Sequence, residues 1–178
     1  VPTRSLSIVE GQHKAPDFVA KYPPGQLPVL EIDDGRMLGE SIAICRYFEA
    51  LNPDPPLFGT DALSIAEIDM WIRRVEFTLM LPIGNIWAHT HPFTARVVNP
   101  QYKEFGESNR PRAAAAMQRF DGVLAQTPFL AGDAYSMADI VLLTTIDFAG
   151  FIGVAMPGDT PALADWHTRV SARPSAAA

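Results

Sequence analysis

Two short segments carry residues whose types and spacing suit the binding of a small ligand: residues 24–32 (PGQLPVLEI) and residues 39–41 (GES). A proline directly before a short apolar strand marks an edge strand or a tight turn, often with a cis peptide bond, and the Leu27–Pro28 bond holds that position. Glu40 and Ser41 stand at the expected start of a helix, where free backbone N–H groups attract an anion. Together the segments predict a site for a small, anionic, peptide-like ligand.

The elements that must position these residues form a small α/β unit. Asp33-Asp34-Gly35 is a strong hairpin signal between two short apolar runs. Apolar residues then recur at mostly helical spacing after Glu40. The expected elements are a strand at 3–9, a short helix at 16–22, strands at 29–32 and 36–38, and a helix at 41–51.

A proline-rich segment follows the last of these helices. Residues 52–56 (NPDPP) contain three prolines within four positions, which makes a stiff, non-helical connector. We therefore predict a first domain at residues 1–51, a linker at 52–60 and a second domain at 61–178.

The second domain is expected to be all-helical. Apolar residues repeat at spacings of three and four from Ile65 to Ile86, and Pro82 should kink this long helix. Ser136 and Asp139 have the pattern of a capping box, so we assign them to helix capping rather than to catalysis. The further helices are expected at 113–124, 136–150 and 163–170.

Composition excludes several functional classes. The 178 residues carry a net charge of −6 and no basic run longer than Arg73-Arg74, so no nucleic-acid surface is expected. The most apolar stretch, 137–156, is interrupted by Asp139 and Asp147, which indicates a buried helix and no membrane span. A single cysteine cannot form an internal disulfide, which favours a cytoplasmic protein.

Five motifs in a fixed order carry a family resemblance. The motifs are GQHKAPDF at 11–18, PGQLPVL at 24–30, ESIAI at 40–44, FLAGD at 129–133 and SMADI at 136–140. The ordered set strongly resembles the cytosolic glutathione S-transferases, with most similarity to their bacterial, theta- or beta-like branch. The resemblance implies an α/β thioredoxin-like domain followed by an all-α helical bundle, a homodimer, and glutathione as cosubstrate.

The start of the chain departs from this family pattern. In the family a strand and a helix precede the strand matched at residues 3–9, and they carry the Tyr, Ser or Cys that usually meets the glutathione sulfur. We therefore expect the chain to be N-terminally incomplete, with its first strand and helix missing. The thiol-activating residue would then lie upstream of Val1.

The resemblance implies roles for the residues around the Leu27–Pro28 turn. Glu40 would accept from the glutathione ammonium, and Ser41 would donate to the γ-glutamyl carboxylate. If the bond before Pro28 is cis, the backbone of Leu27 forms an open strand edge on which the cysteinyl part can pair. The alternatives are plain helix capping by Glu40 and Ser41, and a trans loop proline.

Candidates for the glycyl carboxylate lie nearby in sequence. His13, Lys14 and Gln26 supply positive charge and N–H donors, which suit a carboxylate. The alternative is that these three are exposed loop residues with no ligand role.

The expected reaction needs an ionised thiol. A free thiol has a pKa of about 8.5, so only a small fraction is thiolate at neutral pH. His89 and His91 are candidate assistants in this ionisation; the alternative is two solvated histidines near a helix end. The two alone lack the further ligands of a metal site, so no metal is expected. Cys45 lies on an apolar helix face and is expected to be inert core.

These expectations combine into a glutathione S-transferase that conjugates the glutathione thiolate to small apolar electrophiles. Other glutathione-dependent chemistry on the same fold stays open, namely isomerisation, dehalogenation or disulfide reduction. A non-catalytic glutathione-binding or interaction module is the third alternative.

Overall fold

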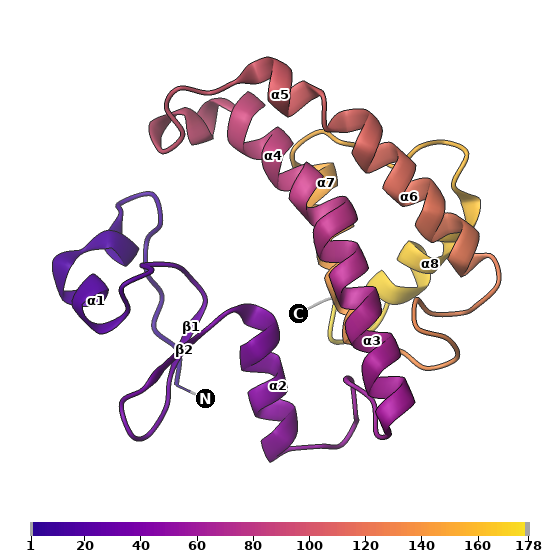
Figure 1. The fold of residues 1–178 in the computed structure, drawn as a ribbon, viewed down its shortest axis with the longest axis horizontal. Coiled ribbons are helices and arrows are strands. Elements are labelled where there is room, and N and C mark those ends of the chain that lie inside the picture. The colour runs from indigo at the N-terminus through magenta and orange to yellow at the C-terminus, as the bar shows by residue number, and fades with distance from the viewer. Residues whose placement is uncertain (1, 177–178) are drawn as a thin grey trace. The chain divides into compact units, whose positions relative to one another are not determined.

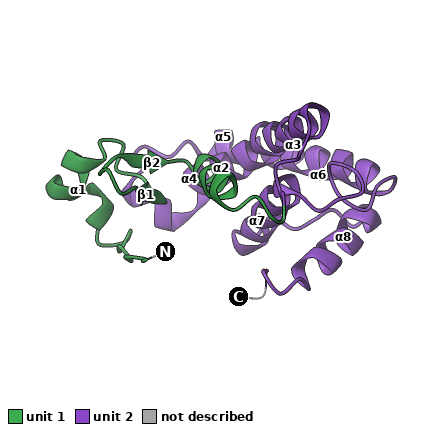
Figure 2. Ribbon diagram, turned by 90° about the horizontal axis from the view of Figure 1, so that it is seen from below, with its two compact units in different colours: residues 1–55 green, residues 56–178 purple. Residues whose placement is uncertain are grey.

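The computed structural model describes residues 2–176 and divides into two compact units, residues 1–55 and 56–178 (Figure 2). The division falls between Pro55 and Pro56, inside the proline-rich segment at 52–56. Over the described residues, no helix has both the length and the apolar character of a membrane span.

The first unit is a β-hairpin with short helices before it and one longer helix after it (Figure 1). Its two strands are antiparallel, with Val29 opposite Gly39 and Glu31 opposite Met37. Gly35 adopts a φ of +83° in the connecting turn, where its N–H donates to the carbonyl of Ile32. In chain order the elements are η1 (Gln12–Lys14), α1 (Pro16–Lys21), β1 (Val29–Glu31), β2 (Met37–Gly39) and α2 (Ser41–Leu51).

The prediction of a strand at residues 3–9 is wrong. These residues form no strand in the structure, and the chain bends into a turn from Ile8 onward. In the described chain β1 and β2 pair only with each other, so residues 3–9 have no strand beside them. Alternating side chains alone do not make a strand, because its backbone groups need a neighbouring strand as partner.

The second unit is a helical bundle that contains all of the buried hydrophobic side chains among the described residues, from Phe58 to Val170. Helix α7 supplies more of them than any other helix and packs against α3 and α8, while α6 packs against α4 and α8. In chain order the helices are α3 (Ala62–Val75), η2 (Glu76–Met80), α4 (Leu81–Thr90), η3 (Pro92–Arg96), α5 (Lys103–Glu107), α6 (Arg110–Leu124), α7 (Met137–Phe151) and α8 (Pro161–Ser171).

The kink expected at Pro82 takes the form of a π-helical segment. Between α3 and α4 lies η2, in which the N–H of Leu81 donates to the carbonyl of Glu76, five residues back. The Thr78 hydroxyl donates to the Arg74 carbonyl over 2.6 Å. Because a proline lacks an N–H and its ring collides with the carbonyl four residues earlier, a wider turn just before Pro82 accommodates it.

Candidate functional site

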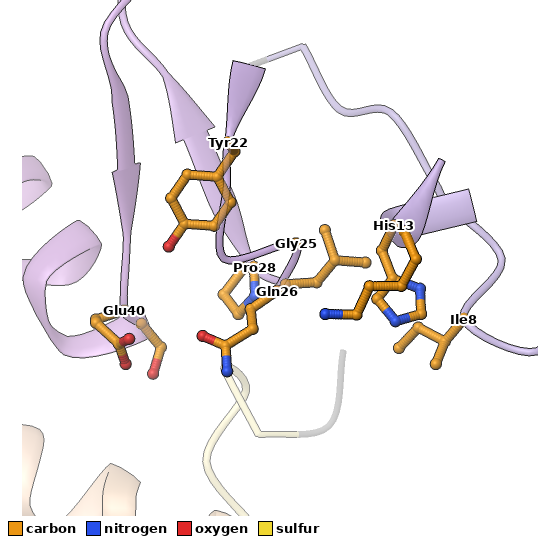
Figure 3. Close-up of a pocket in the computed structure, with 10 residues that line it drawn as sticks. Ile8, His13, Tyr22, Gly25, Gln26, Pro28 and Glu40 are labelled. Atoms are coloured by element: carbon orange, nitrogen blue, oxygen red, sulfur yellow. The ribbon is translucent and has the colours of Figure 1, made fainter. Parts of the chain in front are cut away.

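The first unit contains a cavity of about 410 Å³ around the Leu27–Pro28 turn (Figure 3). All of the residues that the sequence assigns to ligand binding line it. The sequence did not identify Ile8, Tyr22 and Gly25, which also line it. The predicted residues that the structure brings together here are His13, Lys14, Gln26, Leu27, Pro28, Glu40 and Ser41.

The centre of the cavity is formed by the backbone before β1. The Leu27–Pro28 bond is cis, as the sequence predicts, and β1 begins directly after it at Val29. Leu27 is exposed, and neither its N–H nor its C=O forms a hydrogen bond with another described residue. The N–H and C=O of Leu27 can therefore pair with the backbone of an extended peptide, in the way that a strand is added to a sheet edge.

One side of the cavity is formed by the start of α2. Glu40 precedes the helix with a φ of +66°, the only positive φ of a non-glycine residue in the described chain. Its side chain makes no capping hydrogen bond, so the first N–H groups of α2 stay available beside the exposed Ser41. A helix start with free N–H groups, a hydroxyl and a carboxylate can hold both the carboxylate and the ammonium of an amino acid.

The opposite side of the cavity carries the basic side chains. Lys14 Nζ donates to the Pro24 carbonyl over 3.1 Å, which fixes the ammonium at the rim. Gly25 has a φ of +56°, and a Cβ there would lie 2.9 Å from the His13 carbonyl oxygen, so a glycine permits this close approach. The Nδ1 atom of His13 is buried and has no hydrogen-bond partner among the described residues.

The two sides give the cavity a charge pattern. Lys14 presents a cation on one side, which the His13 imidazole also lines, while Glu40 presents an anion next to a helix start on the other. A ligand with a carboxylate at each end and an ammonium at one end matches this pattern. A central peptide group would meet the backbone of Leu27.

The two histidines proposed as assistants lie in the second unit and are both engaged with backbone. His89 Nδ1 accepts from the N–H of Tyr102 over 3.1 Å. His91 Nδ1 accepts from the N–H of Phe93 over 3.2 Å, and its ring stacks on Trp87. The Nδ1 atom of each imidazole thus binds the backbone that follows α4. The Nε2 atom is the ring nitrogen that could take part in a proton transfer.

Comparisons with known proteins decide the family. A model of the glutathione S-transferase C-terminal domain matches residues 86–174, and a model of the N-terminal domain of the same family matches residues 1–56. The chain is 37% identical over 171 residues to glutathione S-transferase 2 of Saccharomyces cerevisiae, covering 96% of this chain and 73% of that protein. It belongs to the glutathione S-transferase family.

Solved structures agree with this assignment. Gtt2 from Saccharomyces cerevisiae superposes with a TM-score of 0.90 at 37% identity, covering 97% of this chain and 83% of that one. A glutathione S-transferase domain-containing protein from Marinobacter aquaeolei gives a TM-score of 0.91 at 34% identity, covering 96% and 84%. This transferase-family chain therefore has a thioredoxin-like N-terminal domain with a small sheet and a helical C-terminal domain, as the sequence predicts.

The chain is also similar to part of proteins with other names. Elongation factor 1-gamma of Prunus avium is 33% identical over 140 residues, which covers 78% of this chain and 31% of that longer protein.

Among the residues that the structure describes in this glutathione S-transferase family member, no three His, Cys, Asp or Glu side chains are grouped to hold a metal ion.

Proposed function

We propose that the protein is a glutathione transferase that binds glutathione in the cavity of its first unit and joins the glutathione sulfur to a small apolar electrophile. The observation that carries this proposal is the cavity itself. It combines the open backbone edge of Leu27 with the helix start at Glu40–Ser41 and the basic rim at Lys14.

The proposed binding mode places each part of glutathione against a matching group. The γ-glutamyl carboxylate meets Ser41 and the N–H groups of α2, while the ammonium meets Glu40. The cysteinyl part pairs with the backbone of Leu27. The glycyl carboxylate lies toward His13, Lys14 and Gln26.

The proposed reaction is a nucleophilic substitution or addition. The thiol proton goes to solvent, and the thiolate sulfur forms a bond to an electrophilic carbon. In a substitution the leaving group departs with the bonding electrons; in an addition the electrons of the broken π bond move to the neighbouring atom, which takes a proton from solvent. We propose His89 and His91 as residues that assist thiol ionisation. Replacing each by alanine tests this role, because an assistant's loss raises the pH at which conjugation reaches half its maximum.

The deciding experiment measures binding and turnover on the same protein. The wild-type chain is titrated with glutathione by calorimetry and then assayed for conjugation with an aryl halide such as 1-chloro-2,4-dinitrobenzene. We expect saturable binding and a conjugate whose formation needs both reactants. Ser41→Ala should weaken glutathione binding about tenfold, since a hydrogen bond to a carboxylate is lost, whereas Ser108→Ala in the second unit should not.

The similarity to elongation factor 1-gamma supports a second candidate function, namely that of a glutathione-binding or interaction module without turnover. Saturable glutathione binding with no conjugation of any electrophile would favour that candidate. Dehalogenation, isomerisation or disulfide reduction would be recognised by released halide, by an isomerised product or by oxidised glutathione.

We further propose that the protein is a cytoplasmic homodimer. Sedimentation equilibrium gives the mass of the assembly directly and compares it with the 19.4 kDa of one chain. A monomer at micromolar concentration would contradict the dimer and leave the binding proposal unaffected.

A further inference from the structure

Tyr22 is a cavity residue for which neither the sequence motifs nor the proposed binding mode supplies a role. It follows α1 directly and lines the cavity together with Glu40 and Ser41. Figure 3 shows the phenol reaching toward the side of the cavity on which Glu40 lies. A neutral O–H donor therefore lies close to the group that binds the charged end of an amino acid.

The backbone and the ring of Tyr22 are both held in place. Its N–H donates to the Phe18 carbonyl and its carbonyl accepts from the Gly25 N–H, each over 2.9 Å. Its ring packs edge-on against Phe18, with centroids 6.5 Å apart and planes at 77°. Because the side chain is already fixed, it loses little conformational entropy when it binds a ligand.

Gly39 provides the space that the phenol occupies. A Cβ at Gly39 would lie 2.8 Å from Cζ of Tyr22 and closer still to its hydroxyl oxygen, so any other residue would displace the ring. Gly39 does not have a positive φ and pairs with Val29 in the hairpin, so its backbone does not require glycine. Position 39, directly before Glu40, is therefore a glycine because the Tyr22 ring needs the space.

The Tyr22 hydroxyl forms no hydrogen bond with any residue that the structure describes. We propose that this hydroxyl donates a hydrogen bond to the γ-glutamyl carboxylate of glutathione, which makes Tyr22 a binding and specificity residue. The proposal rests on the proposed function. Two carboxylate oxygens offer about four acceptor positions, so Ser41 and the N–H groups of α2 leave room for this donor.

The test removes each partner of the proposed hydrogen bond separately. Wild type and Tyr22→Phe are titrated by calorimetry with glutathione and with γ-aminobutyryl-cysteinyl-glycine, which is glutathione without that carboxylate. For glutathione we expect the Kd of Tyr22→Phe to rise about tenfold, since a charge-assisted hydrogen bond is lost. For the analogue we expect the same Kd in both proteins.

Two further variants separate a lost hydrogen bond from a disturbed fold. Tyr47→Phe removes a phenol from α2 in the same unit, away from the cavity lining, and should leave both Kd values unchanged. Gly39→Ala displaces the intact Tyr22 phenol and should weaken glutathione binding at least as much as Tyr22→Phe does.

The outcomes distinguish the two proposals. A wild-type protein that binds glutathione, with a Tyr22→Phe variant that binds it equally well, overturns the role of Tyr22 and leaves the proposed function standing. An equal loss for both ligands also overturns it, because the carboxylate is then not the partner. A wild-type protein that binds neither ligand overturns the proposed function and the Tyr22 proposal together.

Discussion

The indole Nε1 of Trp166 donates a 3.0 Å hydrogen bond to the carboxylate of Asp139, and both side chains are fully buried. The same carboxylate accepts from the N–H of Leu130 over 2.9 Å and from the N–H and hydroxyl of Ser136 over 3.0 and 3.1 Å. Burial raises the pKa of the Asp139 carboxyl, while these donors act to lower it. One carboxylate thus joins the start of α7, the turn before it and α8.

Asp139→Ala should strongly destabilise the protein. The substitution leaves the Trp166 indole and two backbone N–H groups buried without an acceptor, which costs roughly 3 kcal/mol or more of unfolding free energy. Urea unfolding followed by circular dichroism measures the change. Asp165→Ala is the matched control, because Asp165 is exposed and pairs with Arg169 one turn away; its effect should stay within about 0.5 kcal/mol.

The fold was predictable where its causes are local in sequence. The capping box of Ser136 and Asp139 is confirmed, because its two residues lie within one helical turn. The bond from Trp166 to Asp139 joins residues 27 positions apart, and no local pattern predicts it. The strand expected at residues 3–9 failed for a related reason, since a strand depends on a neighbour that the residues themselves do not specify.

The candidate site, like the fold, was predictable only where its causes are local in sequence. The Leu27–Pro28 turn and the helix start at Glu40 could be identified from short motifs, because backbone geometry follows from proline and from helix ends. The pairing of Tyr22 with Gly39 could not, because a glycine with an ordinary φ gives no sequence signal that a ring needs its space. Tyr22 stands just before Pro23-Pro24-Gly25, and that turn was the only available hint.

The backbone of Glu40 predicts a difference between two substitutions. A φ of +66° is unfavourable for any residue with a Cβ and natural for glycine. Glu40→Gly should therefore exceed Glu40→Ala in unfolding free energy by about 1 kcal/mol, as measured by urea unfolding. Both variants lack the carboxylate, so both should weaken glutathione binding to the same extent. A more stable alanine variant would show that Glu40 is not strained.

Cys45 should react slowly with alkylating agents. It lies half-buried in α2, and burial raises the pKa of its thiol. Because only the thiolate reacts, a raised pKa lowers the reactive fraction at any pH below that pKa. Iodoacetamide labelling followed by mass spectrometry should be slower than for free cysteine at pH 8 and should accelerate as the pH rises. Labelling in denaturing urea should remove the difference, and fast labelling of the folded protein would contradict burial as the cause.

Lys14 should account for much of the salt dependence of glutathione binding. Its ammonium is held at the cavity rim by the Pro24 carbonyl, on the side proposed for the glycyl carboxylate. Lys14→Gln should raise the glutathione Kd about tenfold at low ionic strength, because a charge-assisted contact is lost, and the ratio to wild type should shrink as added salt screens the charge. Lys21→Gln is the matched control in the same unit, since Lys21 does not line the cavity and pairs with Glu31. Equal effects of the two substitutions would mean that Lys14 acts only through the net charge of the unit and not through contact with the ligand.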